Sequence, residues 1–193
     1  LLLFTRDPGA ANQLIALHEL LNGNMKLEET SQQDGVRDLY SRLLIGDNRP
    51  DLMVYAKDFA LPVWQAAGIA AGDWNAGDAS NTSNPDKLAE LLHIKNVISV
   101  ATGTSDVDDQ TDHEIWRACK LAGIPCCAIV DSAHNLLGRF RDLAGTLVLP
   151  DHIYLHDHSC CQKLQKDGLK SEILHVIGDL HHDRITARGM DED

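Results

Sequence analysis

LLLFTRDPGAAN, residues 1–12, opens the chain with an apolar run that passes through a polar turn into small residues. We interpret residues 1–5 as a buried β-strand and residues 12–21 as a helix, because apolar residues recur there at helical spacing. Asn22-Gly23 supplies the helix stop. A strand that leads through a tight turn into a helix is the first half of a βα unit, which is the building block of parallel sheets.

Short apolar runs and amphipathic stretches continue to alternate along the chain. This alternation predicts an α/β domain, a three-layer Rossmann-like arrangement with a mostly parallel sheet of about six strands. The expected strands are residues 1–5, 51–56, 96–101, 126–130, 153–156 and 173–177. The expected helices are residues 12–21, 36–44, 60–67, 86–92, 112–122 and 159–166.

The remaining stretches set the domain boundaries. Residues 24–48 are polar and hold at most one weak strand besides the expected helix, and residues 72–85 form a long loop of a kind that is usually functional or mobile. A chain of 193 residues suits one well-buried core. We therefore expect a single domain over residues 1–186 and a frayed acidic tail over residues 187–193.

Composition excludes several classes of protein. The apolar fraction of 44% argues against disorder, and the formal charge of -12 opposes a nucleic-acid partner. No apolar run approaches the roughly 18 to 20 residues of a membrane helix. Five cysteines without a C-x-x-C motif favour reduced thiols and a cytoplasmic location. Because the sequence opens without Met inside an apolar run, we expect residues to precede Leu1.

Ligands of open parallel sheets bind beyond the carboxyl ends of the strands, near the point where the strand order reverses. After the first expected strand, Gly9 lets backbone approach a ligand, and the helix N-terminus offers N–H donors to an anion. The alternative is that Asp7 merely caps this helix. The second loop, residues 102–106, contains Gly103 and the hydroxyls of Thr104 and Ser105, which suit a phosphate or a sugar hydroxyl, although a plain turn explains them as well.

Three carboxylates, those of Asp131, Asp157 and Asp179, each stand just past an expected strand. They either converge on one rim as hydrogen-bond acceptors, metal ligands or a general base, or each caps its own turn. Histidines gather in the final third of the chain and suit a transition metal, but no known ligand spacing supports one, so we expect no metal and no other cofactor. Trp64 and Trp116 are expected in the core, whereas Trp74 in the polar loop suits stacking on a base or a sugar.

Several segments together resemble the N-terminal Rossmann-like domain of GT-B glycosyltransferase-like and sugar-nucleotide epimerase-like proteins of bacterial polysaccharide biosynthesis. They are RDPGAAN (residues 6–12), TGTS (102–105), EIWRACKLAGIP (114–125) and AIVD (128–131), with Asn135, Arg139-Phe140, residues 151–153 and residues 176–178. The resemblance implies that the loops after the strands receive a sugar acceptor, while a C-terminal domain holds most of the nucleotide-sugar donor.

The chain departs from this pattern because it stops soon after Gly178, where the second domain of such proteins begins. Transferase activity would then require a missing C-terminal domain, another chain or a homodimer. Our first hypothesis is a sugar or nucleotide-sugar binding domain. Its rivals are a non-catalytic nucleotide-binding or partner domain and a small metal-dependent hydrolase. The expected catalytic residues are Asp7 and Asp131, and the expected binding residues are Gly9, Asn12, Trp74, Gly103, Thr104, Ser105 and Arg139.

Overall fold

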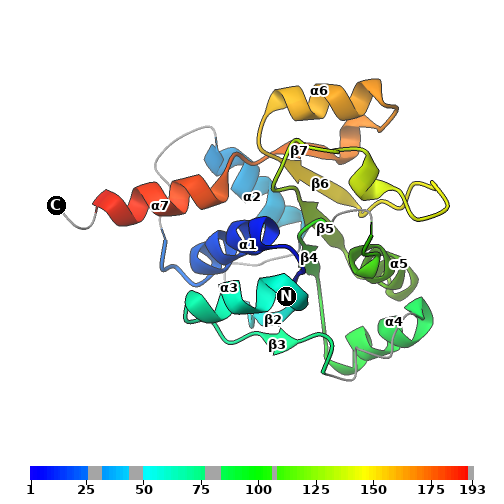
Figure 1. Cartoon of the computed structure of the whole chain (residues 1–193), viewed down its shortest axis with the longest axis horizontal. Helices are drawn as coiled ribbons and strands as arrows, with labels where there is room; N and C mark the ends of the chain where they lie inside the picture. The colour runs from blue at the N-terminus through cyan, green and yellow to red at the C-terminus, as the bar shows by residue number, and fades with distance from the viewer. Residues whose placement is uncertain (26–31, 44–49, 77–83, 106–107, 191–193) are drawn as a thin grey trace.

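The computed structural model describes residues 1–25, 32–43, 50–76, 84–105 and 108–190, without the side chains of residues 32, 33, 189 and 190. Within this part of the chain, seven parallel strands form one sheet between two layers of helices (Figure 1). The strands are β1 (Leu2–Thr5), β2 (Met53–Ala56), β3 (Gly72–Asp73), β4 (Val100–Thr102), β5 (Cys126–Ile129), β6 (His152–Leu155) and β7 (Leu174–Val176).

The strand order is β3-β2-β1-β4-β5-β6-β7, and every pairing is parallel. The chain moves outward from β1 to β3, then returns to the other side of β1 and runs outward again from β4 to β7. The order therefore reverses between β1 and β4, which lie side by side with Phe4 opposite Thr102. This reversal is the switch point at which open α/β sheets bind ligands.

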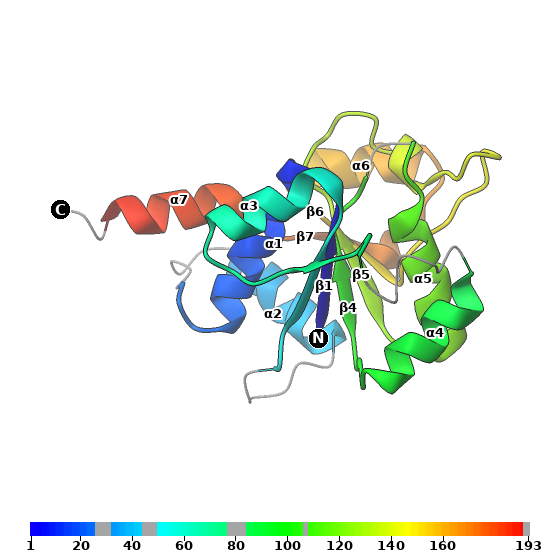
Figure 2. The ribbon, with the colours of Figure 1, turned by 60° about the horizontal axis from the view of Figure 1, so that its bottom comes forward.

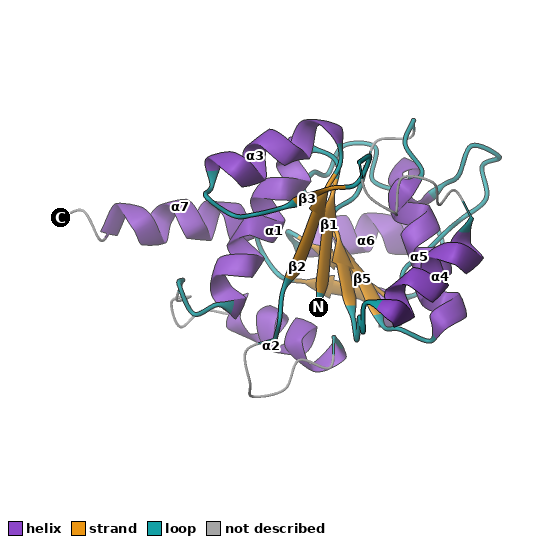
Figure 3. Cartoon of the chain, turned by 90° about the horizontal axis from the view of Figure 1, so that it is seen from below, coloured by secondary structure: helices purple, strands orange, loops and turns teal. Residues whose placement is uncertain are grey.

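In the described ranges, seven α-helices cover the two faces of the sheet (Figure 3). On one face lie α1, α2, α3 and α7, and α4, α5 and α6 lie on the other. α7 packs against α1 and then projects away from the sheet toward the C-terminus (Figure 2). The helices are α1 (Pro8–Leu21), α2 (Gln32–Arg42), α3 (Leu61–Ala66), α4 (Pro85–Ile94), α5 (Thr111–Ala122), α6 (His158–Lys166) and α7 (Leu180–Met190), and short 3-10 helices are η1 (Asp58–Ala60), η3 (Gly138–Phe140) and η4 (Ser171–Ile173).

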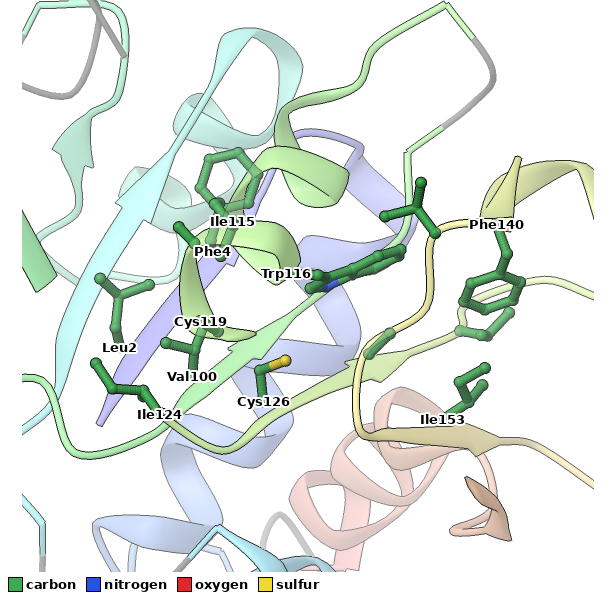
Figure 4. Close-up of a cluster of buried hydrophobic side chains, with 14 of the residues drawn as sticks. Leu2, Phe4, Val100, Ile115, Trp116, Cys119, Ile124, Cys126, Phe140 and Ile153 are labelled. Atoms are coloured by element: carbon green, nitrogen blue, oxygen red, sulfur yellow. The ribbon is translucent and has the colours of Figure 1, made fainter. Parts of the chain in front are cut away.

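Alternate residues of each strand enter different cores. Leu2 and Phe4 of β1 face the helices α4, α5 and α6, while Leu3 faces α1. Such near-continuous apolar strands are expected where both faces of a parallel sheet are covered. In the first core the ring of Trp116 stacks on that of Phe140 with centroids 5.8 Å apart (Figure 4), so the core reaches from α5 to the loop after β5.

The α/β class and the parallel sheet are confirmed, but the expected number of about six strands is too low. The seventh strand, β3, lies inside the stretch expected to be a long loop, and it pairs only Gly72 and Asp73 with β2. Two residues are too short to give an apolar alternation, so sequence reasoning could not detect it. Residues 77–83 of that loop lie outside the described residues.

Two other boundaries differ from expectation. Residues 187–190 continue helix α7 instead of belonging to a tail, and residues 191–193 are not among the described ones. The helix is held on α1 by Arg184 and Arg188, which both donate to Glu19, at 2.9 and 2.7 Å. These ion pairs join residues far apart in the sequence, which local patterns do not reveal. The expected helix 36–44 is α2, whose last described turn ends before Leu44.

Candidate functional site

Two tryptophans fix the strand ends at the switch point. Trp64 of α3 donates its indole N–H to Thr5 Oγ1 at 2.8 Å, and Trp116 of α5 donates to Thr102 Oγ1 at 2.9 Å. Thr5 and Thr102 are the last residues of the adjacent strands β1 and β4, and the two tryptophans approach them from opposite faces of the sheet. Both tryptophans are buried, as expected from the sequence. The loops above these strands therefore start from a rigid base.

Arg139 connects the loops that follow β4 and β5. Its Nη1 donates to Asp131 Oδ1 at 2.7 Å and to Thr104 Oγ1 at 2.8 Å, and its Nε donates to the carbonyl oxygen of His134 at 3.2 Å. The side chains of Arg139 and Asp131 are only 12% and 14% exposed. A charge-assisted bond of this length in a mostly buried setting holds both loops in one arrangement. Thr104 accepts from Arg139, so its hydroxyl proton remains a donor.

Gly9, on the first turn of α1, brings the loop after β1 into this group. A Cβ built at Gly9 would overlap the carboxylate of Asp131, so only glycine lets the helix entry approach that side chain so closely. Gly103 plays a similar role because a Cβ there would overlap Ala10 Cβ. We call Gly9, Thr104, Asp131 and Arg139 the switch-point cluster. The space that Gly9 leaves is filled by a carboxylate of this chain.

His113 of α5 contacts the backbone of Arg139. Its Nε2 lies 2.8 Å from the carbonyl oxygen of Arg139, and its Nδ1 lies 2.8 Å from Gln110 Oε1. Burial lowers the pKa of His113 and favours the neutral ring, whose single N–H donates to one of these two oxygens. The ring of Phe140, the residue after Arg139, is stacked on Trp116. Arg139 is therefore fixed through its backbone as well as through its guanidinium.

Asp112 holds the other end of the loop after β4. Its Oδ2 accepts from the backbone N–H of Ser105 at 2.8 Å, and its Oδ1 accepts from the N–H of His113 at 3.0 Å. Burial raises the pKa of Asp112 to about 7, against the opposing effect of these two hydrogen bonds. Ser105 is itself buried, so its backbone is engaged inside the protein. Residue 106, which ends the expected loop, lies outside the described residues.

A second set of charges lies beside this cluster, beyond β1 and β2. Lys57 Nζ donates to Asp109 Oδ2 at 2.6 Å, and Arg6 Nη1 donates to Asp7 Oδ1 at 2.9 Å. Arg6 Nε also lies 3.5 Å from Asp109 Oδ2 and 3.6 Å from Asp58 Oδ2. Burial opposes ionisation of Asp109, but hydrogen bonds from Lys57 and Thr111 outweigh it and hold the pKa of Asp109 below its usual range.

The structure thus places Asp7, Gly9, Gly103, Thr104, Ser105, Asp131 and Arg139 at the carboxyl edge near the switch point. Asp7 occupies the N-cap position of α1, but its side chain makes no capping hydrogen bond. Asn12 lies on the second turn of the same helix and is partly exposed. Sequence reasoning did not select Arg6, Lys57, Asp109, Asp112 and His113. Arg6 and Lys57 each directly follow an expected strand, which was the available signal for them, whereas Asp109, Asp112 and His113 offered none.

Trp74 does not join this group. Its side chain is 7% exposed and packs edge-on against Phe4 and Tyr55, with ring centroids 4.7 and 5.9 Å apart. The indole follows β3 directly, so it is drawn into the core between the sheet and α4. The polar residues that flank Trp74 in the sequence gave no indication of this burial.

The other carboxylates after the strands have separate partners. Asp157 caps α6 by accepting from Cys160 N at 2.9 Å, and Asp179 accepts from Gln13 Nε2 at 2.8 Å and from His182 N at 3.1 Å. Among the described residues, no three His, Cys, Asp or Glu side chains are placed to hold a metal ion. All five cysteines are buried and free of disulfides. No helix in the described part of the chain has the length and apolarity needed to cross a membrane.

Comparison with solved structures adds the fold relationship. The chain is similar over its whole length to UDP-N-acetylglucosamine 2-epimerase from Rickettsia bellii, with a TM-score of 0.53 and 15% sequence identity. The match covers 48% of that epimerase chain, so this chain spans about half its length. No protein-family model and no curated protein matches the sequence. At this identity the likeness concerns the fold alone, a Rossmann-like parallel sheet.

Proposed function

We propose that this chain is a sugar or nucleotide-sugar binding domain of a glycosyltransferase-like or epimerase-like protein. One observation carries the proposal: Arg139 and Asp131 join the loops after β4 and β5 to the entry of α1 at the switch point of the sheet. Carboxylate, guanidinium and hydroxyl groups in one fixed set suit the hydroxyls of a sugar ring. The fold shared with UDP-N-acetylglucosamine 2-epimerase agrees with this class of ligand.

The proposed roles follow from the contacts. Arg139 donates to a ligand oxygen, and Asp131 accepts a hydrogen bond from a ligand hydroxyl or takes its proton. Thr104 is buried and positions Arg139 by accepting from it. The side chain of Asp7 does not cap α1, so we propose that a backbone N–H group of the first turn donates to an oxygen of the ligand. Asp7, which is bound to Arg6, is placed to orient a second hydroxyl. Gly103 and Ser105 maintain the shape of the loop.

The matched epimerase chain is about twice as long as this chain. We propose that a second domain, another chain or a second copy completes the active site, while this chain holds one part of the ligand. A sedimentation measurement with and without ligand tests the dimer: an unchanged monomer in both conditions argues against it.

A thermal-shift screen tests the binding function. The panel contains nucleoside diphosphates, nucleotide sugars and neutral sugars, because a ligand that binds only the folded state raises the melting temperature. Arg139→Lys retains the charge but loses the planar donor fork, so we expect it to remove most of the shift. Asp157→Asn is the matched control, since Asp157 also follows a strand but caps its own helix. Absence of a shift with every compound would contradict the proposal and favour a partner domain.

A further inference from the structure

Phe59 presents an exposed aromatic ring beside the Arg6 and Lys57 charges. It lies in η1, directly after β2, and is 62% exposed. The guanidinium of Arg6 lies over the ring, 5.5 Å from its centroid. The preceding residue, Asp58, has a φ of 48° and accepts from Asn75 Nδ2 at 2.9 Å, so the turn that carries the ring is held by the loop after β3. With Arg6 over one face of the ring, the exposed remainder of the ring is a surface at the carboxyl edge on which the apolar face of a sugar or a base can pack.

The charges along this edge favour an uncharged ligand. Each of the three cations, Arg6, Lys57 and Arg139, already has a carboxylate partner. The partners in these pairs are Asp7, Asp109 and Asp131, and Asp58 lies 3.6 Å from Arg6 as a fourth carboxylate. The four carboxylates outnumber the three cations. A diphosphate group would add negative charge to an edge that has no unpaired cation among these residues, in a chain of net charge -12. Neutral hydroxyls, in contrast, can both donate to the carboxylates and accept from the guanidinium groups.

The extent of the edge indicates the size of such a ligand. Phe59 follows β2 and Asp131 follows β5, and β1 and β4 lie between them in the sheet. Three interstrand spacings amount to about 14 Å. One monosaccharide does not cover this distance, whereas a short oligosaccharide does.

We infer that the ligand of this edge is a neutral oligosaccharide, with one sugar ring packed on Phe59 and hydroxyls of another ring bound by Asp131 and Arg139, while the buried Thr104 positions Arg139. This inference rests on the proposed function and specifies its substrate class. Phe59 selects for a ring with an apolar face, and the carboxylates disfavour a diphosphate. Trp74, the aromatic residue selected from the sequence, has no such role because it is buried.

NMR titration of the ¹⁵N-labelled chain tests this inference. The probes are neutral trisaccharides of glucose, galactose and N-acetylglucosamine, together with UDP and UDP-N-acetylglucosamine. The variants are Phe59→Ala, Phe59→Trp and the control Ile94→Ala, which removes an equally exposed side chain (68%) at the end of α4, next to the amino ends of the strands. Melting temperatures of all variants verify that the fold is retained.

We expect at least one trisaccharide to bind and Phe59→Ala to weaken it by roughly three- to tenfold, the value of one aromatic contact. Phe59→Trp should retain or increase the affinity, and Ile94→Ala should leave it unchanged. Binding of UDP compounds alone, or a trisaccharide affinity that Phe59→Ala does not change, would overturn the inference while the proposed function stands. If none of the probes binds, the proposed function itself fails.

Discussion

The switch-point cluster and a second polar cluster contain similar residues but have different roles in the structure. In the second, which we call the α2 cluster, Asp38 and Arg42 of α2 meet side chains of β6 and β7. Arg42 Nε donates to both oxygens of Asp38 at 2.8 Å, and Asp38 Oδ2 also accepts from Tyr154 at 3.0 Å. His175 Nδ1 lies 3.3 Å from the same oxygen, and His175 Nε2 lies 3.1 Å from His152 Nδ1.

The two clusters differ in the secondary structure that carries their residues. Members of the α2 cluster sit on a helix and on strands, so their bonds hold α2 on the edge of the sheet. Thr104 and Asp131 follow strands, and Arg139 lies in the short helix η3, where the pairing of helices and strands does not depend on these side chains. Arg–Asp pairs of nearly equal length thus serve attachment in one region and form a candidate binding surface in the other. The following experiments separate these roles.

The largest expected effect is that of Arg139→Ala. It leaves Asp131 mostly buried without its cation, and we expect the free energy of unfolding to fall by about 3 kcal/mol, together with loss of sugar binding. Urea denaturation and the thermal-shift screen measure the two effects. Arg42→Ala is the counterpart: its pair is about one-third exposed, so its loss should cost less than about 1 kcal/mol and leave binding intact. Equal costs for the two variants would contradict the distinction.

The second effect is a pH dependence of the α2 cluster. Burial lowers the pKa of His175 from 6.5 to about 4, against the attraction of Asp38. Between these values the unfolded chain takes up a proton that the folded protein does not, so stability falls as the pH falls. We expect wild type to lose up to about 3 kcal/mol relative to His175→Gln between pH 6.5 and 4, measured by urea denaturation across this range.

Asp112, below the switch-point loops, provides a comparison of opposite sign. Its pKa is raised to about 7 by burial, so the folded protein binds a proton in a range where the unfolded chain does not. Relative to Asp112→Asn, wild type should therefore gain stability as the pH falls from 7 toward 4. As the pH falls, wild type should lose stability relative to His175→Gln and gain stability relative to Asp112→Asn. If both differences change in the same direction, the direction of the pKa shift of one of these two groups is wrong.

A smaller effect is expected from Gly9→Ala. Alanine normally favours a helix over glycine, but here its Cβ would meet the carboxylate of Asp131. We expect stability to fall by about 1 to 2 kcal/mol, and sugar affinity to fall as well because Asp131 must move. Gly35→Ala in α2 meets the backbone carbonyl of Val176 instead, so it should cost more stability without affecting the affinity. Calorimetry of both variants gives the stabilities, and the NMR titration gives the affinities.

The smallest effect is expected from Asp157→Ala, which removes the N-cap of α6. A lost cap costs about 1 kcal/mol of stability. Sugar affinity should remain that of the wild type, because Asp157 bonds only within its own helix turn through Ser159 and Cys160. Reduced sugar binding in this variant would place Asp157 in the ligand site beside Asp131 and extend the switch-point cluster to β6.

Much of the fold could be predicted because each strand and helix carries its own local signal. The run at residues 1–5 and the Gly123 and Gly168 stops each mark a boundary within a few residues, and both glycines have positive φ. Only part of the candidate site could be predicted from such local signals. Asp131 and Gly9 were selected for following a strand, but their mutual contact depends on strand order. Trp74 was expected in an exposed polar loop but is buried, and the exposed Phe59 was not selected, because burial depends on the neighbouring elements.

Local patterns in the sequence establish the α/β class, the parallel sheet and the position of polar loops after strands, since periodicity and helix stops act over a few residues. Packing of the layers brings β1 beside β4, Arg139 to both Asp131 and Thr104, and Arg188 to Glu19. These contacts join residues that are distant along the chain, and their geometry follows from how the layers pack.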